Sequence, residues 1–136
     1  MLHHLSFGVR DIVRAARFYD AVLAPLGYVR VWTDIEDGDP DAAVGYGRPG
    51  GGDLFAIKLR ADRAAAPGEG FHLAFAAPDR AAVQAFHAAA LAQGGRDNGA
   101  PGLRPDYGDD YYAAFVVDPD GYRIEAVIDG SACCGA

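Results

Sequence analysis

The sequence predicts an α+β fold made of two βαβββ modules, because one pattern of residues occurs twice along the chain. The stretch "HLSFGVRD" begins at His4, and "HLAFAAPD" begins at His72. The register that aligns them holds through a strand, a helix and the following turn, as expected for a repeated structural unit. The identical pairs are His4 and His72, Leu5 and Leu73, Phe7 and Phe75, Asp11 and Asp79, Phe18 and Phe86, Ala21 and Ala89, and Gly27 and Gly95.

Each copy begins with a strand and continues into a helix. The segment "LHHLSFGV" alternates, so that its apolar side chains share one strand face while His4 and Ser6 share the other. Asp11 and Asp79 stand where helix N-caps are expected. Helical spacing then predicts one apolar stripe in each copy, ending toward Gly27 and at Gly94-Gly95. The stripes are Ile12, Ala15, Ala16, Tyr19 and Leu23 in the first copy, and Val83, Phe86 and Ala90 in the second.

Strand patterns return after each helix and complete the two modules. They are "YVRVWTDI", "AAVGYG" and "LFAIKL" in the first half, and "YYAAFVV" and "YRIEAVI" in the second. A short edge strand near Leu103 is expected inside the turn-rich segment 95–110. We therefore expect one domain over residues 1–136, with modules at about 1–62 and 70–130 and a tail at 131–136. Their sheets should curve, with apolar helix-facing sides and opposite sides that enclose a metal cavity.

Composition and charge narrow the classes of partner. The net charge of −7 argues against nucleic acid, whose phosphates require a basic surface. No apolar stretch reaches the roughly 20 residues of a membrane span, and no secretory signal is recognised, so a cytoplasmic location is expected. Cys133 and Cys134 are adjacent and lack C-x-x-C spacing, so they are read as part of a frayed end.

Three residues form a candidate metal site. His4 and His72 hold equivalent places in the repeat and face away from the apolar side of their strands. Glu125 stands between Ile124 and Ala126, so it shares this orientation. A buried carboxylate requires a cation, and two histidines with one carboxylate leave open positions on a divalent metal. Fe, Mn, Zn, Ni and Co all remain open, as do structural histidines and a solvated Glu125.

Two aromatic residues are predicted to line the same cavity. The "DPDG" turn that precedes "YRIEAV" sets Phe115 opposite Glu125. Tyr111 then faces the cavity, where a phenol could orient a substrate or relay a proton, and Tyr112 points into the core. A slip of one residue would exchange the two tyrosines.

Three polar residues complete the candidate site. Ser6 shares the strand face of His4 and could hydrogen-bond a metal-bound oxygen. Arg104 could close over an anionic group, with a solvated loop arginine as the alternative. Aligning "FAIKL" with "YRIEA" puts Lys58 at the place of Glu125. Burial beside a metal could lower the pKa of this lysine and make it a base, whereas in the alternative reading its side chain extends to solvent.

With these motifs the chain resembles the vicinal oxygen chelate superfamily, which includes glyoxalase I, bleomycin-resistance proteins, extradiol dioxygenases and fosfomycin-resistance enzymes. The resemblance runs from about Leu2 to Ile128 and is most specific in "HLSFGVRDIVRAARFYDAVLAPLGY", "HLAFAAP" and "DPDGYRIEAV". It implies that His4, His72 and Glu125 are metal ligands, with His3 as a rival of His4. In glyoxalase I a carboxylate occupies the position aligned with Lys58, so strict glyoxalase I activity is not expected.

The function implied by the resemblance is that of a metal-dependent enzyme. Its substrate would be a small molecule that chelates a divalent metal through vicinal oxygens, in a lyase, isomerase or dioxygenase reaction. The alternative is a metal-free small-molecule binding protein of bleomycin-resistance type. The resemblance also implies a homodimer, and it leaves open whether the modules pair within one chain or across two.

Overall fold

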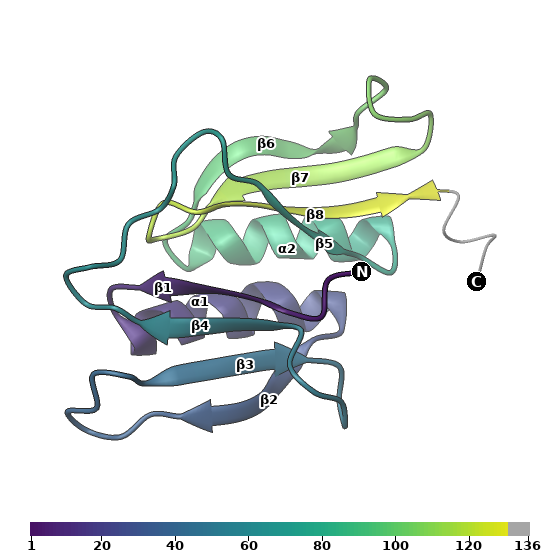
Figure 1. The fold of residues 1–136 in the computed structure, drawn as a ribbon. Helices are drawn as coiled ribbons and strands as arrows, with labels where there is room; N and C mark the ends of the chain where they lie inside the picture. The colour runs from purple at the N-terminus through teal and green to yellow at the C-terminus, as the bar shows by residue number, and fades with distance from the viewer. Residues whose placement is uncertain (131–136) are drawn as a thin grey trace.

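The structure is a computed structural model that describes residues 1–130, so Cys133 and Cys134 lie outside the described residues. It confirms an α+β fold with two βαβββ modules (Figure 1). The first module comprises β1 (Leu5–Val9), α1 (Ile12–Leu23), the short 3-10 helix η1 (Ala24–Leu26), β2 (Val29–Asp34), β3 (Ala43–Gly47) and β4 (Phe55–Leu59). The second comprises β5 (Leu73–Ala76), α2 (Arg80–Ala92), β6 (Arg96–Leu103), β7 (Tyr111–Val117) and β8 (Arg123–Asp129).

The two sheets have the same topology. Their strand orders are β1-β4-β3-β2 and β5-β8-β7-β6, with the first strand parallel to the last in each module. Figure 1 shows α1 behind the first sheet and α2 behind the second, and the two helices also contact each other. Each sheet therefore has one face covered by its helix and an opposite face, called here the open face.

The sheets are separate and do not close around a cavity. Within the described residues, β1 pairs only with β4 and β5 only with β8, so no ladder joins the modules at their seam. The expected enclosure of a metal cavity by curved sheets is not formed within one chain. The open faces instead lie beside each other, in front of the helices in Figure 1.

The core forms where the two helices meet the covered faces of the sheets. Both predicted helical stripes are buried, and Phe18, Tyr19, Val83 and Phe86 are fully excluded from solvent. Complete burial of one large apolar side chain stabilises the fold by about 1.5 to 3 kcal/mol. The amphipathic pattern of the helices thus fixes which sheet face is covered and which stays open.

The helix boundaries follow from local chemistry that recurs in both modules. The side chain of Asp11 accepts a hydrogen bond from the backbone N–H of Arg14 at 3.1 Å, and that of Asp79 accepts one from Ala82 at 2.7 Å. Both predicted N-caps are thereby confirmed. The first helical segment stops at Gly27, whose φ of 91° lies in the left-handed region that glycine tolerates best.

Strand β6 is longer than the short edge strand expected near Leu103. It spans eight residues and pairs with β7 along the outer edge of the second sheet. The ladder shifts register on both sides of Gly99. These bulges allow a glycine- and proline-rich segment to pair with β7, although such residues fit poorly into a regular ladder.

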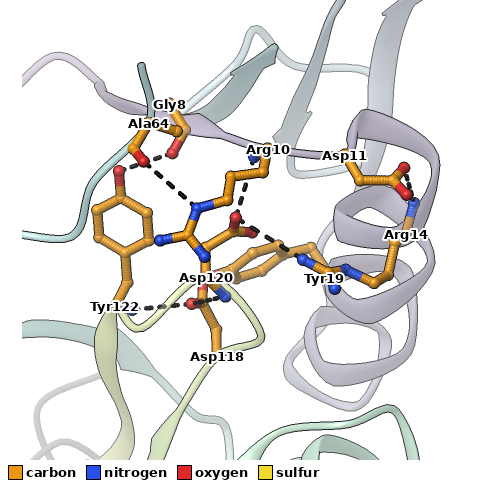
Figure 2. Close-up of polar contacts among 9 residues, drawn as sticks. All are labelled: Gly8, Arg10, Asp11, Arg14, Tyr19, Ala64, Asp118, Asp120 and Tyr122. Atoms are coloured by element: carbon orange, nitrogen blue, oxygen red, sulfur yellow. Dashed lines mark hydrogen bonds and ion pairs between the residues drawn. The ribbon is translucent and has the colours of Figure 1, made fainter. Parts of the chain in front are cut away.

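A polar cluster ties the β7–β8 turn of the second module to the first module (Figure 2). The Tyr19 hydroxyl in α1 donates to Oδ2 of Asp118 at 2.5 Å. The Tyr122 hydroxyl donates to the Gly8 carbonyl oxygen in β1 at 2.6 Å. These two bonds cross between the modules and hold their relative placement.

The two turn carboxylates in this cluster are buried. Burial raises the pKa of Asp118 to about 6, although the Tyr19 hydrogen bond acts in the opposite direction. Oδ1 of Asp120 accepts from the backbone N–H of Arg10 at 3.0 Å and lies 3.8 Å from the Arg14 guanidinium. Oδ2 of Asp120 is buried without a hydrogen-bond partner among the described residues. The turn between β7 and β8 therefore links the two modules, although burying its two carboxylates is electrostatically unfavourable.

Candidate functional site

The open face of the second sheet carries a cavity of about 590 Å³. Strand β8 contributes Glu125, β7 contributes Tyr111 and Phe115, and the residue before β5 is His72. Phe115 pairs with Glu125 in the β7–β8 ladder, which confirms the register predicted from the "DPDG" turn. The side chains that line this His72–Glu125 cavity are His72, Asp106, Tyr107, Tyr111, Phe115 and Glu125.

The Glu125 carboxylate contacts two of the other residues that line this cavity. Glu125 is only 1% exposed, and each of its carboxylate oxygens contacts a polar side chain. Oε1 contacts Nε2 of His72, and Oε2 accepts a hydrogen bond from the Tyr111 hydroxyl at 2.5 Å. A buried carboxylate without such partners would cost several kcal/mol. The half-exposed imidazole and the phenol therefore fix the position of this side chain.

Tyr111 acts as a hydrogen-bond donor in this geometry. Burial raises the pKa of its phenol, and the hydrogen bond to Glu125 and the charge of that carboxylate raise it further. The phenol consequently keeps its proton at neutral pH. The Tyr111 ring also makes an edge contact with Tyr107, with centroids 5.3 Å apart, and His72 lies at 5.6 Å from the Phe115 ring.

Asp106 and Tyr107 line the cavity but were not among the residues predicted from the sequence. Both lie in the loop between β6 and β7, inside the turn-rich segment. Such a loop has no periodicity from which side-chain direction could be inferred. The one available signal was an aromatic residue between two acidic ones in "PDYGD".

His4 lies apart from the other two predicted metal ligands. It lines a smaller cavity of about 200 Å³ between the modules, next to apolar residues of both sheets, and its Nδ1 lies 2.8 Å from Nδ1 of His3. Among the described residues, no cluster of three or more His, Cys, Asp or Glu side chains could hold a metal ion. One chain therefore brings together His72 and Glu125 and leaves His4 elsewhere.

The pairing of strands corrects the sequence-based match of Lys58 with Glu125. Leu5 pairs with Phe55 and Ser6 with Ala56, whereas Leu73 pairs with Ile124 and Ala74 with Glu125. The counterpart of Glu125 is thus Ala56. The alignment was misled by an isoleucine that precedes both Lys58 and Glu125, while hydrogen bonding sets the register. Because Ala56 has no carboxylate, it cannot give His4 the contact that Glu125 gives His72, and no other carboxylate contacts His4 within the described residues.

Lys58 and Ser6 lie on the open face of the first sheet. They alternate with the buried Ile57 and with Phe7, and neither residue lines the His72–Glu125 cavity. Arg104 lies beside that cavity, with its guanidinium 5.3 Å from the centre of the Phe115 ring. The structure thus groups Tyr111, Phe115 and Arg104 with Glu125.

The sequence matches the family model of the Glyoxalase/Bleomycin resistance protein/Dioxygenase superfamily over residues 1–126. The chain belongs to this superfamily. A search of curated proteins gave no match. No described helix is both long and apolar enough to span a membrane.

Solved structures agree with this assignment. A glyoxalase/bleomycin resistance protein from Albidiferax ferrireducens T118 is 34% identical, with a TM-score of 0.71 over 92% of this chain and 95% of that one. A glyoxalase/bleomycin resistance protein/dioxygenase family enzyme from Burkholderia phytofirmans PsJN is 22% identical, with a TM-score of 0.65 over 93% and 96%. Glyoxalase I from Zea mays is 17% identical, with a TM-score of 0.71 over 98% of this chain but 47% of that one. The last two similarities concern the fold alone.

Proposed function

We propose that this protein is a metal-dependent enzyme acting on a small substrate that chelates a divalent metal through vicinal oxygens. The reaction would be of lyase, isomerase or dioxygenase type. The observation that carries the proposal is the buried Glu125 carboxylate, held between His72 and Tyr111 at an accessible cavity. Superfamily membership supports the same reading.

His72 and Glu125 fit a metal in their donor chemistry. An imidazole nitrogen in contact with a carboxylate oxygen combines two donor types that first-row divalent metals accept. We propose His4 as the third ligand, supplied by a second copy of the chain in a homodimer. When bound, the divalent metal ion, whether Fe, Mn, Zn, Ni or Co, would supply positive charge that stabilises an anion developing on the substrate oxygens.

The remaining residues position the substrate and hold protons. Tyr111 holds the Glu125 carboxylate in place by donating a hydrogen bond to its Oε2 atom. The Phe115 ring offers an apolar surface beside His72. In a homodimer that joins the open face of one first sheet to this cavity, Ser6 would hydrogen-bond the substrate. Lys58 would act there as an amine base from the same face.

Elemental analysis of purified protein tests the proposal. We expect about one divalent metal per chain, lost in each of the variants His4→Ala, His72→Ala and Glu125→Ala. His87→Ala is the matched control because His87 bonds to Asp97 outside the cavity, so this variant should keep its metal. A parent protein that binds none of the five metals after incubation would contradict the proposal.

A metal-free binding protein of bleomycin-resistance type is the second candidate. It is favoured by the aromatic residues Tyr107, Tyr111 and Phe115, which give the cavity rings on which a planar ligand could stack. The two functions differ in their response to chelators. A metal-free binding protein would retain ligand affinity after treatment with EDTA, whereas the proposed enzyme would lose its activity.

A further inference from the structure

The side chain of Arg104 folds back over the open face of the second sheet. Arg104 directly follows β6, and its Nη2 donates to the Ala100 carbonyl oxygen at 2.6 Å. Its Nη1 donates to the Leu103 carbonyl oxygen at 3.4 Å, and its guanidinium packs on the Phe115 ring. These contacts hold the guanidinium in one place and leave its other N–H groups free to donate.

Two glycines of β6 make the space that Arg104 occupies. A Cβ atom added to Gly99 would lie 3.3 Å from Nη2 of Arg104, and one added to Gly102 would lie 3.1 Å from Nη1. The Gly99 position would also meet the Phe115 side chain at 2.9 Å. A side chain at either glycine would therefore crowd the guanidinium against the sheet.

Arg104 also forms no ion pair with an acidic residue in the described part of the chain, although the full sequence has 19 Asp and Glu residues against 12 Lys and Arg. Among the described residues, Arg14, Arg30 and Arg60 each form an ion pair with an aspartate, whereas Arg104 forms none. Its acceptors are neutral carbonyl groups and the face of an aromatic ring. The positive charge is thus positioned without being neutralised.

The register of the second sheet fixes where this charge lies relative to Glu125. Glu125 pairs with Phe115, and Phe115 pairs with Gly99, so the three residues form one row across β8, β7 and β6. Two strand spacings separate the ends of the row by about 10 Å. Arg104 covers the Gly99 end, and Phe115 lies between the guanidinium and the proposed metal-binding end.

We infer that Arg104 determines specificity by binding a carboxylate of the substrate, at the end opposite to the vicinal oxygens. This inference rests on the proposed function of the cavity. Its substrate class is a small carboxylate-bearing chelator with a flat, apolar middle that lies over Phe115. A guanidinium with free N–H groups matches a carboxylate in both charge and planar geometry.

Isothermal titration calorimetry with two matched chelators tests the inference. Para-carboxybenzohydroxamate and para-carbamoylbenzohydroxamate present the same vicinal oxygens and differ only in carrying a carboxylate or a neutral amide. With metal-loaded protein we expect the carboxylate form to bind about tenfold more tightly, the order expected of a charge-assisted hydrogen bond. Arg104→Gln should remove this preference, and Arg104→Lys should keep part of it. Arg96→Gln, at the opposite end of β6, should leave the preference unchanged.

The outcomes separate this inference from the proposed metal function. Equal affinities of the two chelators in the parent, or a preference that survives in Arg104→Gln, would overturn the role of Arg104. The same titrations are repeated with metal-free protein. If adding metal raises the affinity of neither chelator while the carboxylate preference still depends on Arg104, the inference is supported and the metal proposal is contradicted.

Discussion

The open faces of the two sheets differ most along one row of equivalent positions. In the first sheet this row consists of Ser6, Ala56, Gly45 and Trp32, and in the second of Ala74, Glu125, Phe115 and Gly99. The aromatic ring comes from the edge strand β2 in the first row and from the inner strand β7 in the second. A Cβ atom on Gly45 would lie 2.3 Å from the Trp32 ring, so that ring lies flat against the first sheet.

This exchange shows how a duplicated fold can specialise. In the second row the aromatic residue is on the inner strand, so Phe115 lies beside the Glu125 carboxylate. The edge position is then Gly99, and the Arg104 side chain packs over it. Replacing a small residue by Glu125 then gives His72 a partner that His4 lacks. The strand order is the same in both modules, so differences at a few positions distinguish the face with a flat ring from the cavity that contains an acid, an imidazole and a phenol.

The largest effect on stability is expected when a glutamate is placed in the first row, at the position equivalent to Glu125. Ala56 is buried, and no described residue supplies a counterpart of the Tyr111 hydrogen bond there. Ala56→Glu should lower the free energy of unfolding by about 3 kcal/mol or more, since it buries a charge with incomplete partners. Urea denaturation measures this change.

A double substitution sharpens the same test. If the first row is a true counterpart of the second, His4 should partly stabilise the new carboxylate, as His72 does for Glu125. His4→Ala should then cost more stability in the Ala56→Glu background than in the parent, which a double-mutant cycle would reveal. Equal costs in both backgrounds would show that the two rows are not equivalent.

The loops at the ends of the inner strands give a second comparison. The β3–β4 loop is glycine-rich and exposed, whereas the β7–β8 turn carries the buried Asp118. Because burial raises the pKa of Asp118 from 3.8 to about 6, the folded state favours its protonated form. Stability from this group is therefore complete below about pH 4 and is lost as the pH rises through about 6.

Asp118→Asn isolates this contribution, because an amide oxygen can still accept the two backbone N–H bonds made by Oδ1. Relative to the variant, the parent should lose about 2 to 3 kcal/mol of stability between about pH 4 and about pH 7, at about 1.4 kcal/mol per pKa unit. Denaturant unfolding across this pH range measures the difference. The groups that face Asp118 are Tyr19, Tyr122 and Asp120. Parallel curves for parent and variant would assign the pH dependence to other groups.

The repeat explains why the fold and much of the site could be predicted from the sequence. The N-caps Asp11 and Asp79 and the pairing of Phe115 with Glu125 depend on short-range patterns that one strand, helix or turn contains. The counterpart of Glu125 depended on alignment across loops of unequal length, and there the identity of Ile57 and Ile124 was misleading. Likewise, Tyr107 lines the cavity from a loop, and a loop sequence has no periodicity from which its path could be predicted.

The smallest predicted effect on stability concerns the phenol of Tyr111, which contacts Glu125 and has no counterpart beside Ala56 among the described residues. Tyr111→Phe removes the hydrogen bond to Oε2 and should lower the free energy of unfolding by about 1 to 3 kcal/mol, because one oxygen of a buried carboxylate loses its donor. Tyr107→Phe is the matched control, since its ring contacts Tyr111 but its hydroxyl makes no hydrogen bond recorded among the described residues. If Tyr111 also positions Glu125 as a ligand, the Phe variant should bind metal about tenfold to a hundredfold more weakly, as is common when a metal ligand loses the hydrogen bond that orients it. A loss of stability with unchanged metal affinity would limit Tyr111 to a structural role, and the two rows would then differ in chemistry only through Glu125 itself.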